Sequence, residues 1–295
     1  MAIVAPASND GESVKMMERS LSSLGPRGFH KIAYTEWGRE DDACPIVCVH
    51  GLTRNSRDFD IFADAMARTG RRVVCPDMAG RGASEWLSVK TDYDFPLYMA
   101  DCAALLARLG AEQVDWVGTS MGGIIGMGLA SQPGSPIRRL VLNDIGPFIP
   151  KEGLARIREV VSWNPLFADL GEVEATLRTA LRSFGRFTDE QWAHLARHAV
   201  RREEDGLRLH YDPGIVEGVA KGDAGDVDLW PLFEAVRCPV LILRGAQSDI
   251  LTHDTAQEMC RRHPDCRMVE FRGVGHAPML MDEEQINVVR DWLEK

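Results

Sequence analysis

The chain has 295 residues, a hydrophobic content of 45% and a formal net charge of −10. This length suits one large α/β domain with an insertion, or two small domains, and the composition supports a substantial buried core. No apolar stretch of the sequence approaches the roughly 20 residues of a membrane helix. No cluster of basic residues is present either, so the sequence predicts neither a membrane partner nor a nucleic-acid partner.

The N-terminus and the cysteines indicate the cellular compartment. Residues 1–16 are small and polar, lack the basic start and apolar run of a secretory signal, and are expected to form a flexible extension. The seven cysteines are scattered, odd in number and without a C-x-x-C pair, which is typical of reduced thiols. From these two features we expect a cytoplasmic location.

Short apolar runs alternate with amphipathic segments along most of the chain. The pattern predicts two strands between 17 and 38, and further strands at 45–49, 72–76, 114–118, 140–142, 239–243 and 268–271. Helical spacing of apolar residues is found at 56–69, 95–109 and 281–294. This alternation predicts an α/β fold with a parallel sheet and helices on both faces.

The alternation breaks between about residues 148 and 230. That stretch is expected to be entirely helical, with helices at 151–162, 172–184 and 188–201. It contains too many aromatic side chains for a solvated linker. We therefore expect a core built from 17–147 and 231–295, with 148–230 inserted as a helical cap over the edge where Ser120 emerges.

The segment around Ser120 is the most informative part of the sequence. An apolar strand leads directly into Gly118-Thr119-Ser120-Met121-Gly122. Small residues two positions before and after the serine permit a sharp strand-to-helix turn, which exposes the hydroxyl and leaves the Met121 amide beside it. His50-Gly51-Leu52 follows an earlier strand, so the Leu52 amide is expected to be the second donor of an oxyanion hole.

A nucleophilic serine needs a base, and the base needs an acid that orients it. His276 follows the last expected strand in Gly275-His276-Ala277-Pro278 and is the candidate base. Two aspartates are candidate acids, because Asp144 and Asp249 each follow a strand that ends at the same edge of the sheet as Ser120.

Five other residues give weaker signals. Arg54 would suit an anionic substrate, although pairing with a local carboxylate explains it better. His210 and Tyr211 are candidates for the substrate pocket or for packing beneath the cap. His194 and His198 have a metal-compatible spacing, but no Glu follows His194 and the sequence reveals no third ligand, so neither a metal nor a cofactor is expected.

Together these motifs resemble those of the α/β-hydrolase superfamily. The matching segments are His50-Gly51, Asp77…Gly80-x-Gly82-x-Ser84, Gly118–Gly123, Arg244-Gly245-x-x-Ser248-Asp249 and Gly275–Pro278. The resemblance implies an eight-stranded, mostly parallel sheet and a cap that controls the substrate pocket. The order Ser, Asp, His of that superfamily favours Asp249 over Asp144 as the acid.

Within the superfamily, the chain resembles small carboxylesterases of bacterial type. This resemblance implies that Ser120, His276 and Asp249 cleave a small-molecule carboxylic ester through an acyl-enzyme intermediate. The alternatives are a C–C bond hydrolase or enol-lactonase of aromatic catabolism, and a hydrolase-fold receptor with slow turnover. Ala277 stands where the C–C hydrolases usually have an aromatic residue, which favours the esterase.

Overall fold

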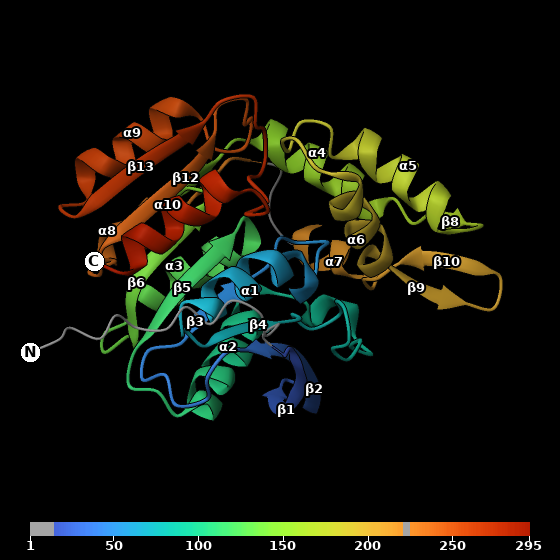
Figure 1. Cartoon of the computed structure of the whole chain (residues 1–295), viewed down its shortest axis with the longest axis horizontal. Coiled ribbons are helices and arrows are strands. Elements are labelled where there is room, and N and C mark those ends of the chain that lie inside the picture. The colour runs from blue at the N-terminus through green and yellow to red at the C-terminus, as the bar shows by residue number, and fades with distance from the viewer. Residues whose placement is uncertain (1–14, 221–224) are drawn as a thin grey trace, which may run out of the picture.

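The computed structural model describes residues 15–220 and 225–295, with an eight-stranded sheet at its centre (Figure 1). The strands follow the order β1-β2-β4-β3-β5-β6-β12-β13, and only the β1–β2 and β2–β4 pairs in this sheet are antiparallel. The strands are β1 Met17–Gly25, β2 Gly28–Trp37, β3 Ile46–Val49, β4 Val73–Pro76, β5 Val114–Thr119, β6 Ile137–Asn143, β12 Val240–Gly245 and β13 Cys266–Phe271. The expected eight-stranded, mostly parallel sheet is thus confirmed.

Helices cover both faces of the sheet because successive side chains of each central strand point to opposite sides. In β3, Val47 and Val49 pack in one apolar layer, whereas Ile46 and Cys48 pack in the other. The first layer includes residues of α2 Phe95–Leu109, α3 Met121–Ala130, α8 Trp230–Ala235 and α9 His253–Arg262. The second includes residues of α1 Asp60–Arg68, which follows the 3₁₀ turn Ser56–Phe59, and of α10 Glu283–Leu293. Burial on both faces explains why these strands are continuous apolar runs.

The inserted segment, residues 148–230, leaves the core after β6 and returns before α8. Its described helices are α4 Lys151–Ser162, α5 Leu170–Ala180, α6 Asp189–Ala199 and α7 Ile215–Ala220. It also contains the three-stranded antiparallel sheet of β8 Leu166–Phe167, β10 Gly206–Leu209 and β9 Val200–Glu203, and β7 Phe148–Ile149 pairs with β11 Val227–Asp228.

The expectation that residues 148–230 are entirely helical is therefore wrong. The hydrophobic pattern did not predict these strands because they are only two to four residues long. The charged run Arg201–Asp205, which reads as a solvated surface, forms β9 and the turn of a hairpin in which Glu203 pairs with Gly206.

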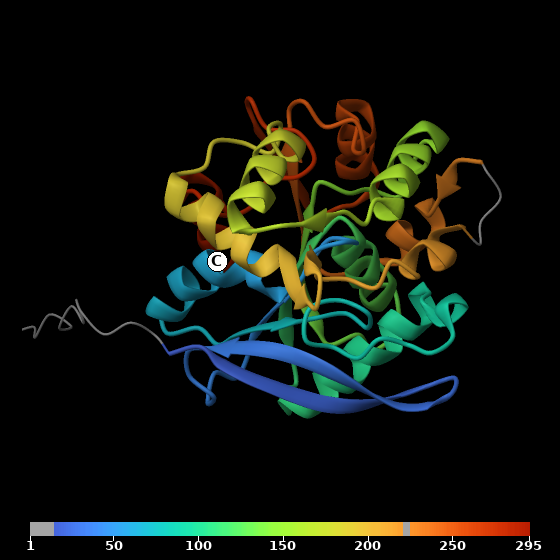
Figure 2. The same cartoon turned by 90° about the vertical axis from the view of Figure 1, so that its right-hand side faces the viewer.

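The inserted segment and the β1–β2 hairpin border one another, since residues of both line one cavity. Figure 2 shows the segment facing the viewer, with the hairpin along the bottom and α9 at the top, as the strand order requires. Most of the expected N-terminal extension, residues 1–14, lies outside the described residues. Within the described ranges, every helix is too short or too polar to cross a membrane.

Candidate active site

Ser120 lies in a sharp turn between β5 and α3. Its backbone has φ 50° and ψ −112°, an uncommon conformation for a residue with a side chain. The turn depends on close backbone contacts, because a Cβ on Gly118 would lie 2.3 Å from the Gly122 oxygen, and a Cβ on Gly122 would lie 2.0 Å from the Val49 oxygen. The Ser120 amide also donates to the Asn143 oxygen (3.0 Å), which ties the turn to the end of β6.

Ser120, His276 and Asp144 form a continuous chain of hydrogen bonds. His276 Nδ1 lies 2.8 Å from Asp144 Oδ2, and His276 Nε2 lies 3.1 Å from Ser120 Oγ. Since the carboxylate accepts, Nδ1 carries the proton and Nε2 is left to accept the serine proton. This is the tautomer that a general base for Ser120 requires.

The Asp144 side chain is fully buried and held from several directions. Its backbone has φ 56°, in the left-handed region, and its amide donates to the Leu243 oxygen (2.8 Å). Its carboxylate accepts from the Gly245 amide (2.8 Å) and from Ser248 Oγ (2.5 Å) as well as from His276. The loop after β12 thus wraps around the carboxylate of Asp144.

This arrangement corrects the preference for Asp249. The hydrogen bond to His276 Nδ1 that was expected from Asp249 is made by Asp144, while the side chain of Asp249 is exposed. The physical reason is the tight turn after β12, in which the Ser248 amide donates to the Gly245 oxygen (2.9 Å). That turn points Ser248 toward Asp144 and carries Asp249 past it to the surface.

The loop His50-Gly51-Leu52 lies against Ser120. A Cβ on Gly51 would lie 3.8 Å from Ser120 Cβ. The buried ring of His50 accepts from the Met78 amide at Nε2 (3.0 Å), so its Nδ1–H donates to the Gly51 oxygen (2.7 Å). The Gly51 oxygen and the Leu52 N–H belong to one trans peptide and point in opposite directions. His50 therefore fixes the direction of the Leu52 N–H.

Burial also keeps the ring of His50 neutral. Removal from water, with the nearby Arg81 as a smaller cause, lowers its pKa to about 4. The role of His50 in holding the loop was not recognised from the sequence, where it was only a neighbour of Leu52.

Arg81 is a further residue of this region that the sequence did not reveal. Its side chain is fully buried, and Nε donates to the Leu52 oxygen (2.8 Å) while Nη2 approaches Met121 Sδ (3.7 Å). A second donor, Nη1, binds the hydroxyl of Tyr98 (2.7 Å). Among the residues that the structure describes, no carboxylate forms an ion pair with this guanidinium, which lies over the rings of Tyr93 and Tyr98.

The weaker sequence candidates take no part in the hydrogen-bond chain of Ser120, His276 and Asp144. Arg54 pairs with the carboxylate of Asp58 (Nε–Oδ2 2.7 Å, Nη2–Oδ1 2.6 Å), in line with the simpler interpretation of this arginine. Tyr211 is buried, and its hydroxyl donates to the Trp163 oxygen (2.9 Å) beneath the inserted segment. His210 lines a cavity of about 360 Å³ whose lining does not include Ser120 or His276.

The inserted segment contacts the loop that carries His276. The Phe184 ring packs edge-on against the His276 ring, with centroids 6.5 Å apart. The neighbouring Ser183 oxygen accepts a hydrogen bond from the Gly275 amide. Met279 and Met281, which follow His276, are buried in the apolar cluster of α5 and α6. The position of His276 is therefore coupled to the inserted segment.

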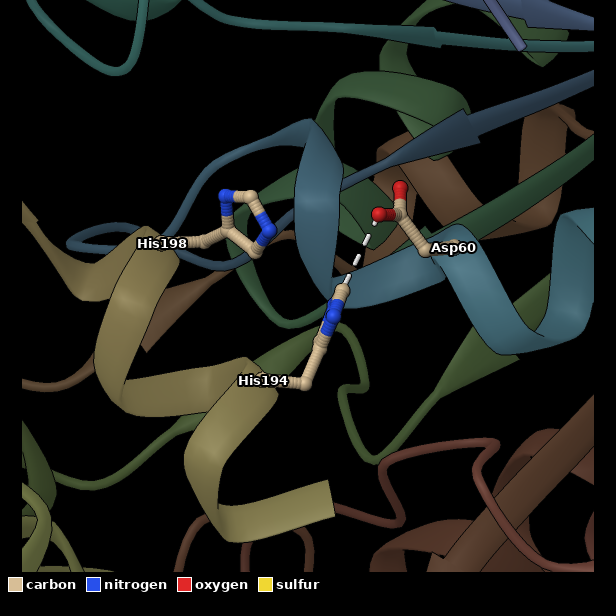
Figure 3. Close-up of side chains that lie close together, drawn as sticks. All are labelled: Asp60, His194 and His198. Carbon is tan, nitrogen blue, oxygen red and sulfur yellow. Dashed lines mark ion pairs between the residues drawn. The ribbon is translucent and has the colours of Figure 1, made fainter. Parts of the chain in front are cut away.

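The histidine pair at His194 and His198 gains a neighbour that the sequence did not suggest. Asp60, at the start of α1, lies close to both rings, and the possible ligand atoms of the three residues are all within 4.8 Å of one another (Figure 3). Burial, with a smaller effect of Arg57, lowers the pKa of His198 to about 4, so this ring is neutral near pH 7.

Comparison with known proteins gives consistent similarities over nearly the whole chain. A sequence profile described as the alpha/beta hydrolase family matches residues 46–288. The chain is 46% identical over 277 residues to a 3-hydroxybutyrate-oligomer hydrolase of Cupriavidus necator, covering 91% of this chain and 94% of that protein.

Solved structures show the same extent of similarity. A putative hydrolase from Rickettsia typhi superposes with a TM-score of 0.87 and 32% identity, covering 95% of this chain and 99% of that one. An alpha/beta hydrolase from Novosphingobium aromaticivorans superposes with a TM-score of 0.83 and 34% identity, covering 95% and 98% of the two chains. The similarity therefore includes the inserted segment as well as the sheet.

Proposed function

The chain belongs to the alpha/beta hydrolase family, and we propose that it is a serine hydrolase that cleaves carboxylic esters with Ser120, His276 and Asp144. That it is a hydrolase follows from the family and from the relative at 46% identity. The observation that carries the finer proposal is the hydrogen-bond chain from Ser120 Oγ through His276 to Asp144.

The chemistry proceeds in two acyl-transfer steps. His276 Nε2 removes the proton from Ser120 Oγ as this oxygen attacks the ester carbonyl carbon, and Asp144 stabilises the imidazolium that forms. His276 then gives the proton to the leaving alcohol as the ester C–O bond breaks. In the second step, His276 takes a proton from water, the hydroxide attacks the acyl carbon, and the acid leaves as Ser120 regains its proton.

The carbonyl oxygen becomes negatively charged during both steps, and the Leu52 and Met121 amides would stabilise it. Neither amide donates a backbone hydrogen bond within the described part of the chain, and His50 directs the Leu52 N–H. One oxyanion donor typically contributes about 3 kcal/mol. The charge of Arg81 behind both residues favours an anion at the same place.

For the substrate, we propose short linear oligoesters of 3-hydroxy acids. This class is supported by the name of the Cupriavidus necator relative and by similarity over 94% of that protein. In this proposal the inserted segment, residues 148–230, acts as the cap over the site, since its residues Ser183 and Phe184 contact the loop of His276.

Steady-state hydrolysis by the wild type and by Ser120→Ala tests the proposal. The substrates are the dimer and trimer of 3-hydroxybutyrate, together with p-nitrophenyl esters from acetate to decanoate. We expect turnover of both sets by the wild type and a fall of roughly 10⁶-fold in kcat for the variant, with an unchanged melting temperature. A variant that retains activity would exclude Ser120 as the nucleophile.

The same assay separates the other classes of function. Rapid hydrolysis of the p-nitrophenyl esters without hydrolysis of the oligomers would overturn the substrate class but leave the serine mechanism intact. A single slow turnover, accompanied by ligand-dependent protection of the inserted segment from hydrogen exchange, would point to a receptor. Inactivity on all esters would direct the assay to enol-lactones and C–C bonds.

A further inference from the structure

Three side chains from two parts of the fold meet away from Ser120. His194 and His198 lie one turn apart on α6 and therefore share a face of that helix. Asp60 is the first residue of α1 in the core and projects toward them (Figure 3). The Asp60 carboxylate supplies a third possible metal ligand, which the sequence alone did not reveal beside the two histidines.

The spacing of these groups approaches that of a metal site. His194 Nε2 lies 3.6 Å from Asp60 Oδ2, and the ring centroids of His194 and His198 are 4.6 Å apart. Bonds of about 2.0–2.2 Å from zinc to nitrogen and oxygen place neighbouring ligand atoms of a tetrahedron roughly 3.3 Å apart. The His194–Asp60 pair is thus close to the required separation, and the possible ligand atoms of all three residues lie within 4.8 Å of one another.

Each of the three groups can present a ligand atom to a metal, two of them by giving up a contact with Arg57. The Asp60 side chain is nearly buried, at 8% exposure, and the ring of His198 makes no hydrogen bond to any residue in the described ranges. His194 Nε2 lies 2.9 Å from the Arg57 oxygen, to which it donates. Metal binding at this nitrogen would require the neutral tautomer with its proton on Nδ1, and it would exchange the hydrogen bond to the Arg57 oxygen for a bond to the metal.

We propose that Asp60, His194 and His198 bind a divalent transition metal, with Zn²⁺ the best match, and that the metal fastens the inserted segment to the core. Two imidazoles and one carboxylate suit zinc better than the oxygen-seeking Mg²⁺ or Ca²⁺. With three protein ligands, a water completes the tetrahedron.

The proposed metal has a structural rather than a chemical role. The three ligands share no hydrogen bond with Ser120, His276 or Asp144 in the ranges that the structure describes. They lie where α6 already docks on the core, since Asn55 Nδ2 donates to the His198 oxygen (2.8 Å). A metal would reinforce that contact, because Asp60 follows the 3₁₀ turn that Asn55 caps and would join the same stretch of the core to α6.

Arg57 competes with the metal for the Asp60 carboxylate and so lowers the metal affinity of the site. Its Nε lies 3.0 and 2.8 Å from the two Asp60 oxygens, and its Nη2 lies 2.6 Å from Oδ2. A metal at Oδ2 must share the carboxylate with this guanidinium, and the two cations repel each other. Arg57 therefore holds Asp60 when the metal is absent, and its removal should strengthen metal binding.

Titration of the full-length, chelator-treated protein with Zn²⁺ and Co²⁺ tests this proposal. We expect one bound metal per chain, visible absorption of tetrahedral Co²⁺ and a raised melting temperature with Zn²⁺. Loss of an outer-shell partner typically costs 10–100-fold in metal affinity, so His194→Ala and His198→Ala should each cost at least about tenfold. Arg57→Gln should raise the affinity severalfold because it removes the competing cation.

His253→Ala is the matched control, since His253 is a half-exposed histidine beside Glu270 and should leave the affinity unchanged. Melting of each metal-free variant checks its folding, and the gain expected for Arg57→Gln is not something a misfolded protein can mimic. Equal affinity in wild type and His194→Ala, or no binding by both wild type and Arg57→Gln, would overturn the site. All readouts are independent of substrate, so they do not depend on the proposed esterase activity.

Discussion

At the scale of single residues, the orientation of His276 depends on one buried carboxylate. Asp144 accepts hydrogen bonds from His276 Nδ1, the Gly245 amide and Ser248 Oγ. These three donors, one at the end of β12 and two on the loops after β12 and β13, leave its side chain little freedom to turn. The carboxylate therefore holds the imidazole with Nε2 toward Ser120, in the tautomer that can accept the serine proton.

The two aspartates give a paired prediction. Asp144→Asn should lower kcat by about 10⁴-fold, because the amide cannot both accept from Nδ1–H and stabilise the imidazolium. Asp249→Asn changes an exposed carboxylate that is not part of the Ser120–His276–Asp144 chain and should change kcat by less than about threefold. Steady-state kinetics of both variants, with circular dichroism as the folding control, measures the difference. The reverse ranking would return the acid to Asp249.

Sequence reasoning could place Ser120 and His276 but could not choose between the two aspartates. Gly118 and Gly122 mark the turn at Ser120 locally, because the backbone contacts that they permit involve neighbouring residues. The choice of the acid depends instead on how the loop after β12 folds against Asp144, a residue about a hundred positions away in the sequence. Arg81 was missed for the same reason, since nothing local indicates that its guanidinium is buried.

At the scale of elements, strand β5 and helix α3 pack closely against each other. Trp116 Nε1 donates to the Gly122 oxygen (3.0 Å) in the first turn of α3. A Cβ on Gly126 would lie 2.3 Å from that same Trp116 nitrogen. The helix can sit this near the sheet only because its inner face is made of glycines.

Gly122→Ala tests this close packing. The added Cβ would lie 2.0 Å from the oxygen of Val49, which is a backbone atom in the central strand β3 and cannot swing away. We expect the free energy of unfolding to fall by about 3 kcal/mol or more, the upper range for overpacked sites, measured by urea denaturation. Gly225→Ala is the control, because no atom of the residues that the structure describes lies within 4 Å of its added Cβ. Equal stability of the two variants would contradict the packing argument.

The elements that sequence reasoning found and missed differ in how much apolar surface they bury. The expected helices at 95–109 and 151–162 agree with α2 and α4 at both ends. The helix α9 was not anticipated, because only Ala256 and Met259 of its residues are buried and the rest of its surface is polar. The short strands of the inserted segment gave too few residues for an alternating pattern to be visible.

At the scale of the whole molecule, the core contains a histidine whose charge state is linked to folding. His50 lies between the ends of two central strands, where its ring binds the Met78 amide and the Gly51 oxygen as a neutral imidazole. Its pKa is lowered from the ordinary 6.5 to about 4 in the folded chain by burial. In the unfolded chain the same ring takes up a proton near pH 6.5.

This difference predicts how stability changes with pH. Between pH 6.5 and 4 the unfolded chain binds more protons at His50 than the folded chain does, so stability falls as the pH falls through this window. From pH 7.5 to 5 the expected contribution is a loss of about 2 kcal/mol in the free energy of unfolding. Urea denaturation at both pH values measures it, with His50→Asn for comparison. The variant should be less stable at pH 7.5, because it loses the ring contacts, yet its loss on acidification should be smaller by about the same 2 kcal/mol. If both proteins lose equal stability, the proton uptake lies elsewhere in the chain and His50 is not the group that couples folding to pH.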